Sequence, residues 1–168
     1  MSAPSFSIAR AAPADIPEIH ALVRALAQYE KLESACVSTE ADLDEALFGP
    51  RPAAEALIAR KNEISPPAAG FALFFYTFST FLGRRSLWLE DLFVRPEHRG
   101  AGIGRALLTR LAGIAQERGC GRFEWAVLDW NESAIRFYQG LGAVVLPDWR
   151  IARVTGHALA QLAMPADD

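Results

Sequence analysis

A glycine-rich turn stands between a strand-like apolar run and an amphipathic helix in the second half of this chain. The turn reads Arg-Gly-Ala-Gly-Ile-Gly over Arg99–Gly104, and the apolar run before it is Leu87–Val94. Glycines adopt positive φ angles cheaply and let a ligand approach the backbone, because they have no Cβ. The free N–H groups and the positive dipole at the start of the following helix attract phosphate. We therefore predict a phosphorylated cofactor here; the alternative is a glycine-rich turn that only begins a helix.

The spacing of the glycines distinguishes the phosphate-binding motifs. The dinucleotide motif G-x-G-x-x-G needs a third glycine where this chain has Arg105, and it belongs to a βαβ unit near the start of a domain. The P-loop motif needs Gly-Lys followed by Ser or Thr, which this turn lacks. The turn does match R-x-x-G-x-G and so resembles the pyrophosphate loop of the GNAT acetyltransferases, which bind acetyl-CoA.

Composition and charge restrict the class of protein. The chain has 168 residues, of which 51% are hydrophobic and 22% charged, and its formal net charge is −3. This length predicts a single domain over residues 1–168. The lack of a basic block argues against nucleic acid or an anionic membrane as a partner. The apolar run Ala68–Leu82 is too short to span a membrane, and no signal-like segment opens the sequence, so a cytoplasmic location is expected.

Cysteines and histidines give no sign of a metal site. Cys36 and Cys120 are far apart and lack the spacing of metal ligands, which favours small thiols in a reducing compartment. His20, His98 and His157 are scattered. We expect no metal.

Hydrophobic periodicity and turn residues predict alternating strands and helices. Strands are expected at Phe6–Arg10, Ala54–Arg60, Gly70–Ser79, Ser86–Val94, Arg122–Leu128, Ala143–Leu146 and Trp149–Thr155. Helices are expected from Ile16 to about Tyr29, from Ser38 to Phe48, from Ile103 to Gly119, over Asn131–Leu141 and, weakly, over His157–Ala163. Adjacent strands mixed with crossover helices predict an α+β sheet and not a regular βαβ array.

Two acidic residues interrupt an apolar strand just before the turn. Glu90 and Asp91 lie within Leu87–Val94, where charges are costly to bury unless they have a partner or a task. Neighbours on a strand face opposite ways, so only one should reach a given pocket unless a bulge intervenes. A carboxylate can take the proton that an alkylammonium must lose before it becomes a nucleophile. The alternative is a salt-bridged or solvent-facing pair on an edge strand.

A tyrosine follows on the next predicted helix. Tyr138 and Asn131 are seven residues apart and lie on one side of that helix. A tyrosine can return a proton to a leaving thiolate, since its ordinary pKa is ~10. The alternatives are an aromatic side chain packed on the sheet for Tyr138 and a helix cap for Asn131.

Together these motifs resemble the GNAT superfamily, and within it the diamine acetyltransferase group, which includes the spermidine/spermine N1- and thialysine N-epsilon-acetyltransferases. The resemblance is carried by Leu89–Gly104, Leu128–Ala143, Leu26–Glu30, Thr39–Leu43 and Phe71–Phe78. It covers most of the chain. It implies the GNAT fold, with a mixed and mostly antiparallel sheet of about six or seven strands flanked by helices.

The resemblance also implies roles for individual residues. Glu90 would be the base, acting through water, and Tyr138 the general acid. The amine would be bound by Glu30, Ser79, Phe81, Glu90 and Asp91. Acetyl-CoA would be bound by Leu92, Phe93, Val94, Arg99, Gly100, Ala101, Gly102, Ile103, Gly104, Asn131, Ala134 and Tyr138.

Departures from the polyamine enzymes bear on the acceptor. Ser79 and Phe81 stand where those enzymes have an acidic residue and a tryptophan, and Ala134 stands where they have serine. The thialysine-type relatives share the serine at position 79. The expected acceptor is therefore a small primary amine, lysine-like or a short diamine.

Two rival functions remain open, together with one prediction about assembly. The chain could acetylate a protein N-terminus or lysine, or it could be a non-catalytic acyl-CoA-binding module. The resemblance further implies a homodimer, with Trp149–Thr155 crossing or abutting the partner. A sedimentation mass of one chain at micromolar concentration would contradict the dimer.

Overall fold

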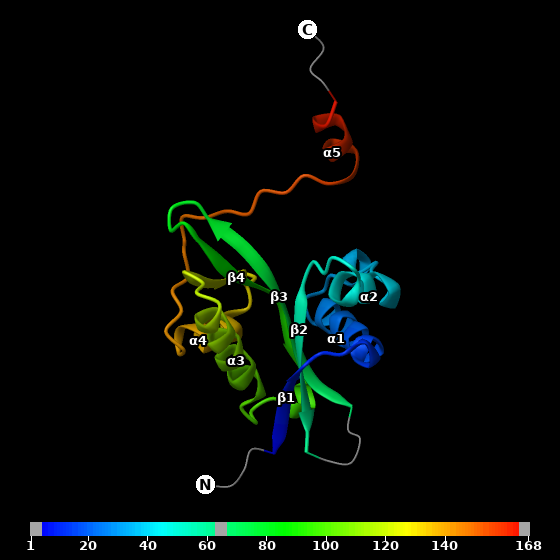
Figure 1. Ribbon diagram of the computed structural model, residues 1–168, viewed down its shortest axis with the longest axis vertical. Helices are drawn as coiled ribbons and strands as arrows, with labels where there is room; N and C mark the ends of the chain where they lie inside the picture. Colours follow the sequence, from blue (N-terminus) through cyan, green and yellow to red (C-terminus); the bar gives the residue numbers. More distant parts are fainter. Residues whose placement is uncertain (1–4, 63–66, 165–168) are drawn as a thin grey trace. The chain divides into compact units, whose positions relative to one another are not determined.

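The computed structural model describes residues 5–62 and 67–164 (Figure 1). The chain divides into two compact units, Met1–Ala126 and Val127–Asp168. The first unit contains the sheet and the helices that cover it, and the second contains two short helices. Among the described residues, no helix is long and apolar enough to cross a membrane.

One mixed sheet forms the centre of the first unit. Its strands are β1 (Phe6–Arg10), β2 (Glu55–Lys61), β3 (Ala68–Ser79), β4 (Arg84–Val94) and β5 (Arg122–Trp125), and they lie in this order across the sheet. Neighbouring strands are antiparallel except β4 and β5, which are parallel and are joined through the helix α3 (Ile103–Glu117). The α+β class is confirmed, with five strands in the described residues where six or seven were expected.

The helices α1 (Ile16–Tyr29) and α2 (Glu40–Phe48) pack together on one side of the sheet (Figure 1). α2 begins in a capping box, because the hydroxyl of Thr39 accepts the backbone N–H of Asp42 while the Asp42 carboxylate accepts that of Thr39. The core on this side consists of Ile16, Ile19, Leu22, Leu47, Ala56, Ile58, Ala68, Phe71 and Phe93. Each large apolar side chain buried there contributes about 1.5–3 kcal/mol.

The helix α3 covers the other side of the sheet (Figure 1). The amphipathic character expected of this helix is confirmed, since one face of it is buried: Ile103, Leu107, Leu108, Leu111, Ile114 and Ala115. Short 3-10 helices lie at η1 (Pro13–Asp15), η2 (Glu33–Ala35) and η3 (Pro96–His98). Because α3 starts immediately after the glycine-rich turn, its packing fixes the direction in which the turn presents its N–H groups.

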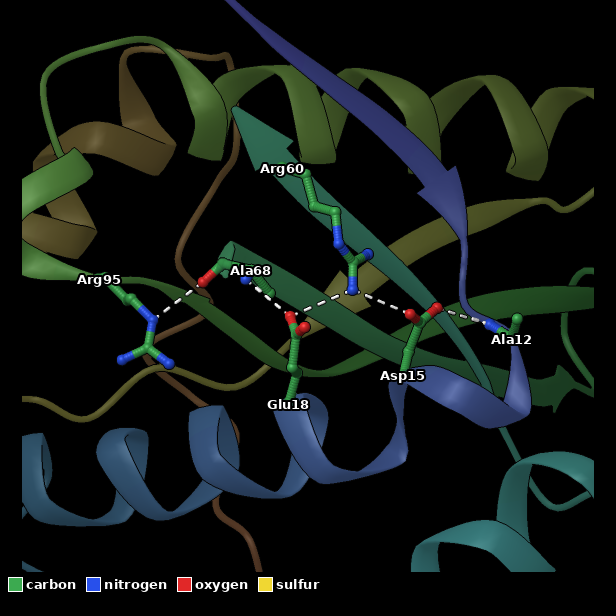
Figure 2. Close-up of polar contacts among 6 residues, drawn as sticks. All are labelled: Ala12, Asp15, Glu18, Arg60, Ala68 and Arg95. Carbon is green, nitrogen blue, oxygen red and sulfur yellow. Dashed lines mark hydrogen bonds and ion pairs between the residues drawn. The ribbon is translucent and has the colours of Figure 1, made fainter. Parts of the chain in front are cut away.

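A chain of polar contacts ties the start of α1 to β2 and β3 (Figure 2). Arg60 Nη2 lies 2.9 Å from Asp15 Oδ1 and 3.1 Å from Glu18 Oε2. Glu18 also accepts the backbone N–H of Ala68 at 2.7 Å. The carbonyl of Ala68 in turn accepts a hydrogen bond from Arg95 Nε at 2.9 Å. Arg95 directly follows β4, so these contacts fix the point from which the chain enters the glycine-rich turn.

The second unit differs from the sequence prediction. It contains α4 (Glu132–Gln139) and α5 (Gly156–Leu162), but the expected strands over 143–146 and 149–155 are absent from the described residues. A strand needs a neighbour that pairs with its backbone groups. In the single chain, the side chains of Val144, Trp149 and Ile151 are instead 80%, 76% and 70% exposed.

Candidate functional site

A β-bulge places the two strand carboxylates on the same side of the sheet. In the β3–β4 ladder, Leu73 pairs with Asp91 and Phe74 pairs with Leu89, so Glu90 is the extra residue. Alternation along β4 puts Glu90 on the side of Trp88, whose Nε1 donates to Glu90 Oε2 at 2.8 Å.

The position of Asp91 follows from its partner across the ladder. Residues directly opposite each other point to the same side of a sheet. Leu73 packs against the core under α1 and α2, so Asp91 lies on the α1 side of the sheet. Phe74 and Leu89 lie on the opposite side. The bulge therefore removes the alternation that would have separated Glu90 from Asp91.

A third carboxylate lies at the end of α1. Glu30 is the C-cap residue of that helix, and burial raises the pKa of its carboxyl. The pKa of Asp91 is raised from 3.8 to about 6, mainly by burial and then by the negative charges of Glu90 and Glu30. A bound cation would relieve this repulsion.

No group of His, Cys, Asp or Glu in the described residues is arranged to hold a metal ion.

The glycine-rich turn has the geometry of an anion cradle. Gly100 and Gly102 have φ angles of +79° and +85°, and no other group lies within 4 Å of where a Cβ would be at either position. Gly102 is the N-cap residue of α3 and has no side chain to accept the first helical N–H groups. These N–H groups are thus available to a phosphate. The open turn fits the pyrophosphate of CoA.

The end of β4 has an open edge. Its pairing with β5 ends at Leu89, opposite Trp125, whereas its pairing with β3 continues to Val94. Among the described residues, no strand pairs with Leu92, Phe93 and Val94 on the β5 side. Backbone groups on this edge can bind an extended ligand in the manner of a missing strand. The open edge suits the contact with acetyl-CoA that the resemblance implies for Leu92, Phe93 and Val94, and this role stays a prediction.

The arginine of the turn makes contacts that the sequence analysis did not find. Arg99 Nε donates to the carbonyl of Val94 at 3.0 Å. Its guanidinium carbon lies 4.9 Å from the ring centroid of Tyr29 and 5.6 Å from that of Phe93. The only feature of the sequence that could have pointed to this contact is the position of Tyr29 next to Glu30, a predicted amine-site residue. The turn and the end of α1 are thus in direct contact within the first unit.

Ser79 and Phe81 are not brought together with the carboxylates in the single chain. Ser79 is buried and its Oγ accepts the N–H of Leu82 at 3.3 Å, while Phe81 is 96% exposed. Both lie at the β3–β4 turn, where Ser79 pairs with Arg84. The length of strand from there to Asp91 corresponds to roughly 20 Å. Their assignment to the amine site stays a prediction.

The remaining predicted residues lie on α4 in the second unit. Asn131 is the N-cap, as its alternative interpretation expected, and its Oδ1 accepts the N–H of Ala134 at 3.2 Å and the hydroxyl of Ser133 at 3.1 Å. Tyr138 lies in the last turn of the same helix, with its ring centroid 5.4 Å from that of Phe137. Their roles toward CoA and the thiolate stay predictions.

Comparison with known proteins gives consistent matches over most of the chain. Residues 21–143 match the model of the acetyltransferase (GNAT) family. The thialysine N-epsilon-acetyltransferase of Bos taurus is 37% identical over 164 residues, covering 93% of this chain and 96% of that protein. The L-ornithine N5-acetyltransferase NATA1 of Arabidopsis thaliana is 34% identical, covering 89% of this chain and 84% of that protein.

Solved structures agree with these sequence matches. An integron cassette protein from V. cholerae superposes with a TM-score of 0.79 at 27% identity, covering 96% of this chain and 99% of that one. The family match over residues 21–143 extends beyond the first unit and includes α4.

Proposed function

The chain belongs to the acetyltransferase (GNAT) family, and on this premise we propose that it transfers the acetyl group of acetyl-CoA to a primary amine of a small molecule. We also propose that residues 1–168 form one acetyltransferase domain. The observation that carries the proposal is the placement of Glu90 and Asp91 on one side of the sheet, with Glu30 close enough to affect Asp91. Three carboxylates beside an anion-binding turn suit a cationic acceptor and a phosphorylated donor.

The chain's residues have separate tasks in the proposed mechanism. Acetyl-CoA supplies an activated acyl carbon and a thiol leaving group. Asp91 and Glu30 hold the ammonium form of the acceptor, and Glu90 takes its proton through a water molecule. The neutral nitrogen then attacks the acyl carbon directly. Backbone N–H groups at the open edge of β4 stabilise the oxyanion. The C–S bond then breaks as the hydroxyl of Tyr138 gives its proton to the departing sulfur, and the attacking nitrogen loses its second proton to the Tyr138 phenolate, so that one proton in all leaves through Glu90.

We propose a lysine-like or ornithine-like amine as the acceptor. The names of two relatives, thialysine N-epsilon-acetyltransferase and L-ornithine N5-acetyltransferase, support this class. Each of these amino acids carries one side-chain amine. Ser79 supports the same choice together with Phe81, because these two stand where the polyamine enzymes have an acidic residue and a tryptophan. Without that acidic residue, the second ammonium group of a polyamine has no anchor at this position.

Assembly and location are also proposals. Two copies would pair through the C-terminal segment. Apolar side chains such as Val144, Trp149 and Ile151 are exposed to solvent there in the single chain, and pairing would bury them. The resemblance to a dimeric group supports this pairing. Cys36 and Cys120 are free thiols, as suits the reducing cytoplasm.

Removing either proton-transfer group should slow the reaction by about a hundredfold or more. Glu90→Gln lacks the base and Tyr138→Phe lacks the acid, and both keep the size of the original side chain. We expect kcat to fall in each variant while calorimetric binding of CoA is retained. The charge control is Glu117→Gln, at an exposed ion pair on α3, which should leave kcat unchanged. Full activity in Tyr138→Phe or in Glu90→Gln would remove that residue from its role.

A further inference from the structure

The contact between Arg99 and Tyr29 joins the two halves of the proposed site. Arg99 belongs to the glycine-rich turn, and Tyr29 is the last residue of α1. The guanidinium carbon lies over the Tyr29 ring at 4.9 Å from its centroid and lies 5.6 Å from the centroid of Phe93, and Nε donates to the carbonyl of Val94. The ring of Phe93 is itself buried in the core. The position of Arg99 is therefore fixed by a rigid strand, and Tyr29 is the part of this contact contributed by α1.

The end of α1 that carries Tyr29 has an unusual backbone. Lys31 has a φ angle of +60° and is the only described residue other than glycine with a positive φ. The N–H of Leu32 closes the helix on the carbonyl of Ala27 at 2.8 Å. A left-handed conformation is unfavourable for a lysine, because its Cβ crowds the following carbonyl oxygen. A contact outside the helix that holds this end in place would select one position for Glu30, which lies between Tyr29 and Lys31.

We propose that Tyr29 is a positioning residue that couples the cofactor turn to the amine site. When the turn orders around a pyrophosphate, Arg99 is fixed against the Tyr29 ring, and the end of α1 with Glu30 is fixed with it. Donor and acceptor then bind cooperatively. By thermodynamic linkage, the amine tightens the binding of the cofactor by the same factor by which the cofactor tightens the binding of the amine. This inference rests on the proposed function.

Calorimetry of two Tyr29 variants tests the coupling. CoA is used in place of acetyl-CoA, so that no reaction consumes the amine, and thialysine is the probe amine. Thialysine is titrated into the wild type, Tyr29→Phe and Tyr29→Leu, each with and without saturating CoA. In the wild type, we expect CoA to lower the Kd for thialysine. Tyr29→Phe keeps an aromatic face and should keep this factor, whereas Tyr29→Leu should reduce it by about threefold.

A change in folding must be separated from a change in coupling. Tyr29 is at the surface boundary, with 36% of its area exposed, so thermal unfolding should show that Tyr29→Leu folds. Tyr29→Met, which is closer to tyrosine in length, serves as a second non-aromatic variant and should behave like Tyr29→Leu. Both should also bind CoA about threefold more weakly than Tyr29→Phe does.

Two results would overturn the inference. One is an equal coupling factor in the wild type, Tyr29→Leu and Tyr29→Met. The other is a wild type in which CoA does not change the Kd for thialysine. Failure of the proposed function has a different signature, since the wild type would then release no CoA from acetyl-CoA with any small amine. If the wild type acetylates a small amine but its coupling factor equals that of every variant, only the role of Tyr29 is contradicted and the proposed function stands.

Discussion

Replacing Asp91 with asparagine is expected to raise the KM for a cationic amine roughly 10- to 100-fold while CoA binding stays unchanged. The substitution keeps the shape of the side chain and removes its charge. Asp91 lies on the same side of the sheet as Glu90 and interacts with Glu30, so it belongs to the set that balances the ammonium. The proposed donor contacts are the glycine-rich turn and backbone groups of Leu92–Val94, which the substitution leaves in place, and for this reason CoA binding should not change.

The same variant should be more stable than the wild type at neutral pH. The folded protein raises the pKa of Asp91 from 3.8 to about 6, so folding disfavours the charged carboxylate. This difference corresponds to at most about 3 kcal/mol. The cost is fully present well above pH 6 and shrinks as the pH falls from 6 towards 3.8. Well below pH 3.8 it is gone, because the side chain is then neutral in both states. We expect Asp91→Asn to unfold at a higher denaturant concentration than the wild type at pH 7.5, and this difference to disappear well below pH 3.8.

Asp44→Asn provides a matched control on the exposed surface of α2. It removes the same charge and should change neither the amine KM nor the free energy of unfolding by a measurable amount. The pH dependence offers a second check, since the wild-type KM for the amine should rise as the pH falls through about 6. An Asp91→Asn enzyme with unchanged amine KM would contradict the role of Asp91 in holding the amine.

Replacing Gly102 with alanine is expected to weaken CoA binding by about tenfold. The φ angle of +85° at Gly102 is costly for alanine, so the turn would relax away from the conformation that presents its N–H groups. The new Cβ would meet no protein atom, because no other group lies within 4 Å. It would instead occupy the space that a phosphate needs. Calorimetric titration of CoA measures the change.

Gly83 provides the control for this variant. It lies in the β3–β4 turn with a φ angle of +60° and has the same open surroundings. Gly83→Ala should therefore cost a similar free energy of unfolding, about 1 kcal/mol, without weakening CoA binding. Equal CoA affinities of Gly102→Ala and Gly83→Ala would show that the glycine-rich turn is not the phosphate site.

Local patterns in the sequence predicted the parts of the fold that depend on neighbouring residues. The apolar face of α3 and the cap at Asn131 follow from helical spacing and capping chemistry, and the structure confirms both. The prediction for the strands over 143–146 and 149–155 was wrong for the single chain. Their β-branched and aromatic residues suit a strand, but a strand also needs a neighbour, and no pattern within the segment reports whether one exists.

The site shows the same division between local and long-range information. The carboxylates and the turn were visible as motifs, but the bulge at Glu90 depends on the register between β3 and β4. That register is set by packing across the sheet. The contact of Arg99 with Tyr29 joins residues far apart in the sequence, and the raised pKa of Asp91 depends on burial and on Glu30. These features depend on how distant segments pack together.

The proposed activity is tested most directly by one reaction. Wild-type protein is incubated with acetyl-CoA and a mixture of thialysine, L-ornithine, spermidine and a peptide with a free N-terminus, and the acetylated products are identified by mass spectrometry. We predict release of CoA with acetylation of the side-chain amine of thialysine or L-ornithine, ahead of spermidine and the peptide. Acetylation of the peptide alone, or binding of CoA without any acetylated product, would contradict the proposed function.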